Sequence, residues 1–247
     1  MDLNLLGLSI TNVTMDDAIA LIDSVSSGRR TMHFVNAHCI NVAAKDAEYR
    51  AILGRTDALF ADGSGIRLAG KWLGNPIIGN VNGTDLFPLL CTRIAQSGKR
   101  MFLLGSAPTI AEKAGRWAEE HAKAAIIAGT HDGYFSTKEE QEAVIAEINA
   151  SGADLLLVAM GVPKQEKWIA LNRERLTVPL CMGVGALFDF YSGTVPRAPM
   201  WMRKVGLEWV WRLAIEPRRM WRRYIVGNVV FVTRLLKIRM RQSKRSR

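Results

Sequence analysis

Short apolar runs alternating with helical segments predict an α/β protein, with a Rossmann-like, mostly parallel sheet, helices on both faces and a basic C-terminal helical appendage. The apolar runs are continuous and too short for typical helices, as expected for strands buried on both faces. Each run ends in a loop of small and polar residues, which is where open α/β sheets hold ligands.

Local signals place the elements in order along the chain. Thr14 is a predicted N-cap, followed by an acidic first turn, for a helix reaching about Ser27. Thr84 is the predicted cap of a helix ending at Gly98, and Thr137 opens a helix with a capping box. Other helices are expected at 39–53, 66–72, 109–123 and 164–175, and strands at 31–36, 57–61, 99–104, 124–128, 155–160 and 178–182.

Charge divides the 247 residues into two parts. The formal net charge is +10, but residues 200–247 sum to +12 and residues 1–199 to −2. We therefore expect a Rossmann-like catalytic body at 1–199 and a basic, Trp-rich, membrane-associating arm at 200–247.

The cysteines and the N-terminus indicate the compartment. Cys39, Cys91 and Cys181 lack metal-ligand or redox spacing, which favours reduced, buried thiols in a cytoplasmic protein. The N-terminus lacks the basic region of a secretory signal, and no apolar run approaches the ~20 residues of a membrane-spanning helix.

The strand-end loops predict a single crevice, because the carboxyl ends of parallel strands share one edge of the sheet. The loop residues are Asn36, Asp62, Gly105, Ser106, Asp132, Gly133, and the segments 161–165 and 183–189. None of these loops carries a dinucleotide or ATP phosphate fingerprint, so no direct support exists for such a cofactor.

The segment 154–170 is the most informative of these connections. A buried strand leads through Gly161 and Pro163 to Lys164 and Gln165 at a predicted helix start, a place that favours an anion. An ordinary connection with solvated Lys and Gln side chains is the alternative.

Asp62 is the best candidate for a catalytic carboxylate, since it follows a strand and two nearby glycines let a substrate approach the backbone. The alternative is that Asp62 caps the next helix. Asp189 is equally compatible with capping, ribose binding or proton transfer. The four histidines show no paired metal spacing and there is no Asp-x-Asp pair, so Lys and Arg would have to neutralise a departing phosphate.

The arm can supply those cations. Four of the seven tryptophans lie among its arginines, a composition typical of helices at anionic membrane surfaces. Single-stranded nucleic acid is the competing partner. Apolar residues between the arginines favour a membrane or core-docking face, so we expect an anionic membrane surface and no nucleic acid.

Seven stretches in order resemble the WecG/TagA/CpsF family of bacterial glycosyltransferases over nearly the whole chain. They are Phe60-Ala-Asp-Gly-Ser-Gly65, Asn82-Gly-Thr-Asp-Leu86, Asp132-Gly-Tyr-Phe135, Gly161-Val-Pro-Lys-Gln-Glu-Lys-Trp-Ile169, Gly183-Val-Gly-Ala-Leu-Phe-Asp189, Arg197-Ala-Pro199, and Gly206-Leu-Glu-Trp209 with Glu216-Pro-Arg-Arg219.

The resemblance implies an inverting, metal-independent hexosyltransferase without cofactor. It would move a hexose or N-acetylhexosamine-type sugar from a UDP-sugar donor to a polyprenyl-diphosphate-linked sugar acceptor, in bacterial surface or exopolysaccharide synthesis. The enzyme would be cytoplasmic and bound peripherally to the inner face of the cell membrane. A homo-oligomer is compatible with the sequence.

The resemblance also assigns roles to residues. Asp62 would be the base, Gln165 and Asn36 would position substrate, and Tyr134 and Asp189 would hold the uridine. The catalytic set is completed by arginines of the arm, Arg212, Arg219 and Arg222, at the diphosphate. The predicted substrate-binding residues are Gly105, Ser106, Asp132, Gly133, Tyr134, Gly161, Lys164, Gly185, Asp189 and Asn80.

Two positions differ from the members that use N-acetylmannosamine. Phe34 and Asn80 stand where those members often have Thr and Arg. The sequence around Asn80 is closer to exopolysaccharide members that transfer glucose or a related hexose.

The alternative from another functional class is a non-catalytic nucleotide or nucleic-acid binding protein with a basic arm. This alternative predicts strongly salt-dependent binding to polynucleotides.

Overall fold

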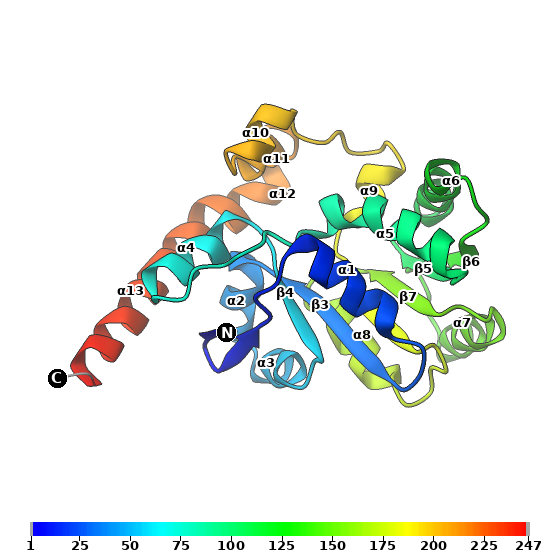
Figure 1. Ribbon diagram of the computed structural model, residues 1–247, viewed down its shortest axis with the longest axis horizontal. Helices are drawn as coiled ribbons and strands as arrows, with labels where there is room; N and C mark the ends of the chain where they lie inside the picture. The colour runs from blue at the N-terminus through cyan, green and yellow to red at the C-terminus, as the bar shows by residue number, and fades with distance from the viewer. Residues whose placement is uncertain (1, 246–247) are drawn as a thin grey trace.

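A computed structural model describes residues 2–245, with side chains for residues 2–240. Its centre is a six-stranded, all-parallel sheet in the order β4-β3-β8-β7-β5-β6 (Figure 1). The strands are β3 (Arg30–Val35), β4 (Ala58–Ala61), β5 (Met101–Gly105), β6 (Ile127–His131), β7 (Leu155–Ala159) and β8 (Leu180–Gly183). The predicted Rossmann-like α/β fold is confirmed.

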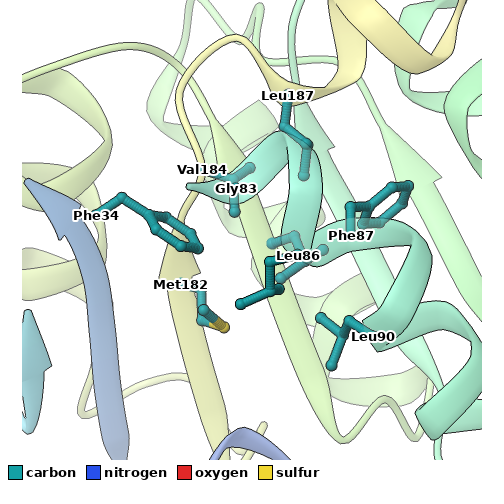
Figure 2. A pocket seen from close by; sticks show the side chains of 9 residues that line it. Phe34, Gly83, Leu86, Phe87, Leu90, Met182, Val184 and Leu187 are labelled. Carbon is teal, nitrogen blue, oxygen red and sulfur yellow. The ribbon is translucent and has the colours of Figure 1, made fainter. Parts of the chain in front are cut away.

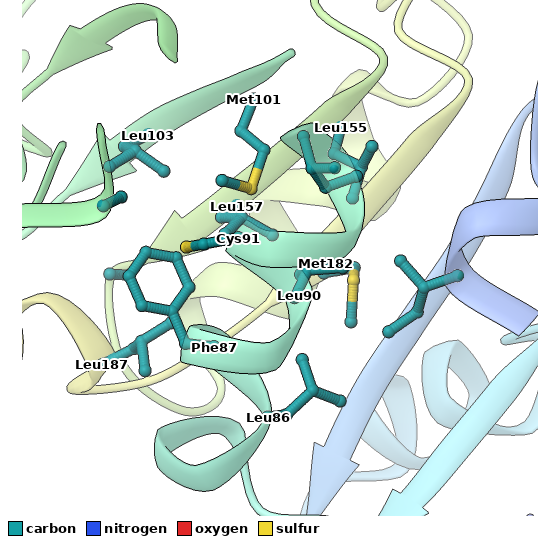
Figure 3. Packing of buried hydrophobic residues seen from close by; sticks show 14 of the residues in the cluster. Leu86, Phe87, Leu90, Cys91, Met101, Leu103, Leu155, Leu157, Met182 and Leu187 are labelled. Atoms are coloured by element: carbon teal, nitrogen blue, oxygen red, sulfur yellow. The ribbon is translucent and has the colours of Figure 1, made fainter. Parts of the chain in front are cut away.

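Helices cover both faces of this sheet, each burying an apolar stripe against it. One face is covered by α1 (Met15–Ser24), α5 (Gly83–Ser97), α6 (Ile110–Ala122) and α9 (Leu187–Tyr191). The other is covered by α2 (Ala37–Ala43), α3 (Ala47–Gly54), α7 (Lys138–Ala150) and α8 (Lys164–Asn172), with α4 (Ser64–Trp72) alongside. Figure 3 shows the first core, where leucines of α5 meet the strand residues Leu155, Leu157 and Met182.

Capping explains several boundaries, including two that differ from the predicted ones. Thr14 and Thr137 form capping boxes as predicted. Thr84 does not cap α5; the Asn82 side chain accepts from the Asp85 amide, so the helix begins one residue before Thr84. The single helix expected at 39–53 is two helices, because the side chain of Asp46 accepts from an amide in the first turn of α3.

Two further differences concern strands. A small antiparallel hairpin of β1 (Leu3–Leu5) and β2 (Leu8–Ile10) precedes α1 and was not predicted. Strand β6 lies three residues later than expected, and the partly exposed residues of this edge strand give little apolar signal.

The C-terminal arm, residues 200–245, is helical. It comprises α10 (Met200–Lys204), α11 (Glu208–Ile215), α12 (Pro217–Trp221), the π-helix η1 (Arg222–Val226) and α13 (Gly227–Arg245). Helix α13 runs beside α2 and α4 and extends beyond the body (Figure 1).

The arm is held on the body by core packing as well as by polar contacts. Phe231 and Leu235 are buried in the same cluster as α2 and α4. The Asn41 side chain of α2 donates to the Gly227 carbonyl over 2.7 Å. Gly65 permits the close contact between α4 and α2, because a Cβ there would lie 2.9 Å from the Ala37 Cβ.

The outward surface of the arm is both apolar and basic. Its exposed apolar side chains include Trp201, Trp221, Ile225, Val226 and Val229. Across residues 2–245, no helix combines the length and apolar character needed to cross a bilayer.

Candidate active site

A cavity of about 610 Å³ lies at the carboxyl edge of the sheet, between the strand-end loops and the arm. The body contributes Asn36, Asp62 and Gln165 to its wall. The arm contributes Arg212 and Arg223, along with other side chains from α10 to α13. The structure thus brings the predicted catalytic carboxylate and amides together with arginines of the C-terminal arm.

Asp62 and Asn36 form the centre of this site. They follow the neighbouring strands β4 and β3, and the Asn36 Nδ2 donates to the Asp62 Oδ2 over 3.1 Å. Flipping the Asn36 amide would break two hydrogen bonds, because its Oδ1 caps α2 by accepting from the His38 and Cys39 amides at 3.1 and 3.2 Å. Asn36 therefore presents a donor, never an acceptor, to the carboxylate.

The surroundings of Asp62 suit a proton acceptor. The residue is half-buried and lines the cavity, and burial raises the pKa of its carboxyl, opposed by the Asn36 hydrogen bond and by the positive charges of Arg223 and Arg212. Asp62 does not cap α4; the N-cap residue is Gly63, whose φ of +86° favours glycine. The Gly63 amide donates to the Asn80 Oδ1 over 2.6 Å, which places Asn80 in the same wall.

Gln165 lies in the wall as part of a buried polar pair. Its Oε1 accepts from the Gly185 amide over 3.0 Å and its Nε2 donates to the Glu166 Oε1 over 2.9 Å. Glu166 is fully buried, and this burial raises its pKa to about 7. The pair fixes both the Gln165 amide and the Gly185 loop.

Four arginines of the arm line the cavity: Arg203, Arg212, Arg219 and Arg223. The Nε atoms of Arg203, Arg212 and Arg223 are buried and have no hydrogen-bond partner among the described residues. Their guanidinium groups give this part of the wall a positive charge, which suits an anionic ligand.

Arg222 and Arg223, both in the π-helix η1, are placed differently. Arg223 and Tyr224 line the cavity, whereas Arg222 is exposed, lies outside the lining and places its guanidinium 5.3 Å from the Trp221 ring centroid. Of the three arm arginines expected at the diphosphate, Arg212 and Arg219 line the cavity and Arg222 does not, whereas Arg223, which was not predicted, does. π-Helical turns, with their i→i+5 hydrogen bonds, are frequent at functional sites.

The predicted uridine-binding loops form a neighbouring group outside the cavity lining. The Gly133 amide donates to the Ser106 carbonyl over 3.2 Å, and the Tyr134 amide donates to the Asp132 Oδ1 over 2.9 Å. Tyr134 is 71% exposed, so its ring is open to a ligand.

Asp189 links this group to the cavity. Burial raises the pKa of its carboxyl, opposed by the Arg219 charge and by a hydrogen bond with Ser106. The adjacent Phe190 lines the cavity, and the Arg212 guanidinium lies 4.9 Å from its ring centroid.

Among the other predicted residues, some line the cavity and others lie outside it. Gly161 and Gly185 line the cavity, whereas Gly105 lies outside the lining with the uridine-loop group. Lys164 is exposed and outside the lining, so the first turn of α8 contributes Gln165 to the cavity but not the expected lysine.

Several cavity residues were not predicted. Glu208, Trp209 and Tyr224 come from the arm, and His38 from α2. Burial raises the Glu208 pKa, and burial together with the Arg223 charge lowers the His38 pKa to about 4, so His38 is neutral near pH 7. Glu208 and Trp209 belong to one of the stretches that resemble the family, and this resemblance could have identified them as site residues.

Within residues 2–245, no group of three or more His, Cys, Asp or Glu is arranged to hold a metal ion.

The fold and the site define a Rossmann-like protein whose cavity is completed by an arginine-rich helical arm. A family model described as "Glycosyl transferase WecG/TagA/CpsF family" matches residues 3–245. The chain therefore belongs to this family of glycosyltransferases, which act on a sugar donor and an acceptor.

A comparison with solved structures finds a nicotinate phosphoribosyltransferase from Vibrio cholerae at 14% identity and a TM-score of 0.25. The match covers 79% of this chain and 48% of that one, so the chain spans about half the length of that structure. At this level of similarity the match carries no argument.

Proposed function

We propose that the protein transfers a hexose or N-acetylhexosamine-type sugar from a UDP-sugar to a polyprenyl-diphosphate-linked sugar, with inversion and without a metal ion. The observation that carries this proposal is the half-buried Asp62 carboxylate, hydrogen-bonded by Asn36 in a cavity that arginines of the arm close. Membership of the glycosyltransferase family supports the reaction class.

Asp62 acts as the general base. The acceptor hydroxyl gives its proton to the Asp62 carboxylate as its oxygen bonds to the anomeric carbon. The bond from that carbon to the diphosphate oxygen breaks on the opposite face, and UDP leaves with the electron pair. One displacement of this kind inverts the anomeric configuration.

The arginines of the arm stabilise the leaving group. Charge develops on the diphosphate as the bond breaks, and preorganised donors aimed at that charge lower the barrier. Arg212 and Arg219 lie toward Asp189, beside the proposed uridine loops, and would serve the donor diphosphate. Arg223 lies toward His38 and Asp62, where it would serve the acceptor side.

The same helices would hold the enzyme at the membrane surface. Residues 219, 223, 224, 228 and 231 line the cavity, while Trp221, Arg222, Ile225, Val226 and Val229 are exposed. A helix with apolar and basic residues on its free face binds the interface of anionic lipid. A lipid-linked acceptor in that interface would reach the cavity from the arm.

The test is acceptor-dependent release of UDP, screened across UDP-sugars with a synthetic polyprenyl-diphosphate-sugar in the presence of EDTA. We expect release with one donor class, and none without acceptor. If no donor gives release although UDP binds to the protein, the proposed reaction is wrong.

A further inference from the structure

Glu208 presents a free carboxylate to the cavity. It is the first residue of α11, lines the cavity and is half-buried. Across residues 2–240, whose side chains the structure describes, no group forms a hydrogen bond or ion pair with this carboxylate, and its oxygens remain accessible. An accessible carboxylate that accepts no internal hydrogen bond can accept hydrogen bonds from a ligand.

This carboxylate lies close to the proposed base. Burial raises the pKa of Glu208, and the negative charges of Asp62 and Asp85 raise it further, against the positive charges of Arg197 and Arg203. Both of these arginines are already held by the Asp85 carboxylate, over 2.5 and 3.3 Å. Glu208 and Asp62 therefore form a part of the site that is distinct from the arginines proposed for the diphosphates.

The charge of this part restricts what can bind there. A negatively charged group placed between Glu208 and Asp62 would be repelled by both carboxylates. An uncharged sugar would not be repelled, and its hydroxyl groups are donors, which an ionised carboxylate needs because it can only accept hydrogen bonds. The two carboxylates therefore favour an uncharged, hydroxyl-bearing ring.

Aromatic and apolar side chains complete the surroundings of such a ring. Trp209 and Tyr224 both line the cavity, with ring centroids 6.1 Å apart and ring planes inclined by 53°. Phe34, Val184 and Leu187 add an apolar stretch of wall near the carboxyl ends of β3 and β8 (Figure 2). A sugar ring has an apolar face of C–H groups and an edge of hydroxyls, so it can pack against such side chains while its hydroxyls meet the carboxylates.

The position of Glu208 indicates which sugar it meets. In the proposed reaction the acceptor hydroxyl contacts Asp62, and the other hydroxyls of the same ring lie only a few ångströms away. Glu208 also belongs to the arm, from which a lipid-linked acceptor would enter the cavity.

We propose that Glu208 binds the acceptor sugar by accepting a hydrogen bond from a hydroxyl other than the reacting one, and that it selects uncharged acceptor sugars. This inference rests on the proposed function and specifies the class of its acceptor.

The experiment measures kcat/KM for a set of synthetic acceptors in the wild type, Glu208→Ala, Glu208→Gln and Glu112→Ala. The acceptors are polyprenyl-diphosphate-linked glucose, galactose and N-acetylglucosamine, each with its monodeoxy forms and its uronic acid. Glu112 is the matched control, because it is also an acidic residue in the first turn of a helix, α6, but pairs with Arg116 over 3.2 Å and lies outside the cavity lining. Melting temperatures show whether the variants are folded, and Glu208→Gln carries the comparison if Glu208→Ala is not.

We expect Glu208→Ala to lower kcat/KM for the acceptor by about ten- to a hundredfold, the range for loss of a hydrogen bond to a charged group, with an unchanged KM for the donor. Glu208→Gln should lose less, because its amide oxygen still accepts. For one monodeoxy acceptor the loss caused by Glu208→Ala should shrink to less than about threefold, since the hydroxyl bound by Glu208 is then absent. The uronic acid should be the poorest acceptor for the wild type, and Glu112→Ala should behave like the wild type.

Three results would overturn the role of Glu208 alone. They are an unchanged kcat/KM in Glu208→Ala, equal losses on the parent and on every monodeoxy acceptor, and an effect confined to the KM of the donor. Equal use of a uronic acid and its parent by the wild type would overturn the selection of uncharged acceptors. Absence of transfer from every donor to every acceptor would overturn the proposed function and the role of Glu208 with it.

Discussion

Asn36 and Asp62 are joined by a hydrogen bond whose direction is fixed, since the Asn36 Oδ1 is occupied by two backbone amides and only Nδ2 can face the carboxylate. The bond stabilises the charged form of Asp62 and so lowers its pKa against the larger effect of burial. Asn36 thus helps to keep the proposed base deprotonated.

Asn36→Ser should separate this effect from the cap, because serine can still cap α2 but carries no amide donor. Without the donated bond, the Asp62 pKa rises further. We expect kcat to fall by roughly tenfold or more near neutral pH, and the acid limb of the pH–rate profile to move to higher pH. A lower kcat with an unmoved acid limb would show that Asn36 acts by another route.

Arg223 and Arg222 are adjacent in sequence, but Arg223 lines the cavity and Arg222 is exposed outside the lining, which makes them a matched pair. Arg223→Ala should reduce kcat/KM by about ten- to a hundredfold, the range expected for a charge-assisted contact with a phosphate. Arg222→Ala should retain transfer to a water-soluble acceptor and weaken binding to anionic liposomes by about fivefold, as for loss of one cation near the surface.

Both variants are assayed for sugar transfer and for binding to liposomes in a pelleting assay. A gel-shift assay with a polynucleotide tests nucleic acid as the alternative partner. Equal loss of transfer in both variants would argue against different roles for the two arginines. Tight, salt-dependent polynucleotide binding would favour the nucleic-acid alternative.

Asp85 joins the arm to the body. Its Oδ1 lies 2.5 Å from Arg197 and 3.3 Å from Arg203, and Arg203 lines the cavity. Although burial raises its pKa, hydrogen bonds from Asn82 and Arg197 and the charges of both arginines lower it overall, so Asp85 is charged near neutral pH.

Asp85→Asn should loosen the arm, leaving Arg203 without its ionic partner. We expect faster proteolysis within residues 200–245 and a several-fold higher KM for the donor. The control is Asp57→Asn, which removes a carboxylate 2.6 Å from Arg30 near the start of β3, far from the arm. Proteolysis of the arm at the same rate in both variants would rule out the anchoring role.

Glu166 makes the stability of the protein depend on pH. Burial raises its pKa from an ordinary value of 4.5 to about 7 in the folded protein, so the folded state binds the proton more tightly than the unfolded chain. Stability should therefore decline as pH rises from about 4.5 through 7, by up to a few kcal/mol, since one pKa unit corresponds to about 1.4 kcal/mol.

Glu166→Gln should remove most of this decline, because the side-chain oxygen can still accept from Gln165 while no buried charge forms. Chemical denaturation at pH 5 and pH 8 measures the effect. If the wild type and Glu166→Gln lose the same free energy of unfolding between pH 5 and pH 8, the pH dependence belongs to other groups.

The arrangement of strands and the convergence of their loops were predictable because their signals are local. Apolar runs and following polar residues located Asn36, Asp62 and Gln165, and parallel topology brought them to one edge. The break between α2 and α3 occurs because Asp46 caps the start of α3. The apolar periodicity of the sequence alone does not show whether a helix continues through such a residue or restarts at it.

The arm was harder to predict because tertiary contacts decide the direction of its side chains. The arginines and tryptophans of the arm give no indication that Arg223 lines the cavity while Arg222 is exposed. The docking of Phe231 and Leu235 against α2 and α4 divides an apparently uniform apolar segment into a core face and a free face.

The most direct test of the central claim is Asp62→Asn, measured for acceptor-dependent transfer and for donor binding in the same preparation. The substitution keeps the shape of the side chain and removes the proton acceptor. We expect kcat to fall by about 10²- to 10⁴-fold, the usual contribution of a general base, while UDP-sugar binding is retained. Near-normal turnover by Asp62→Asn would contradict the account, and loss of donor binding would make Asp62 a structural residue.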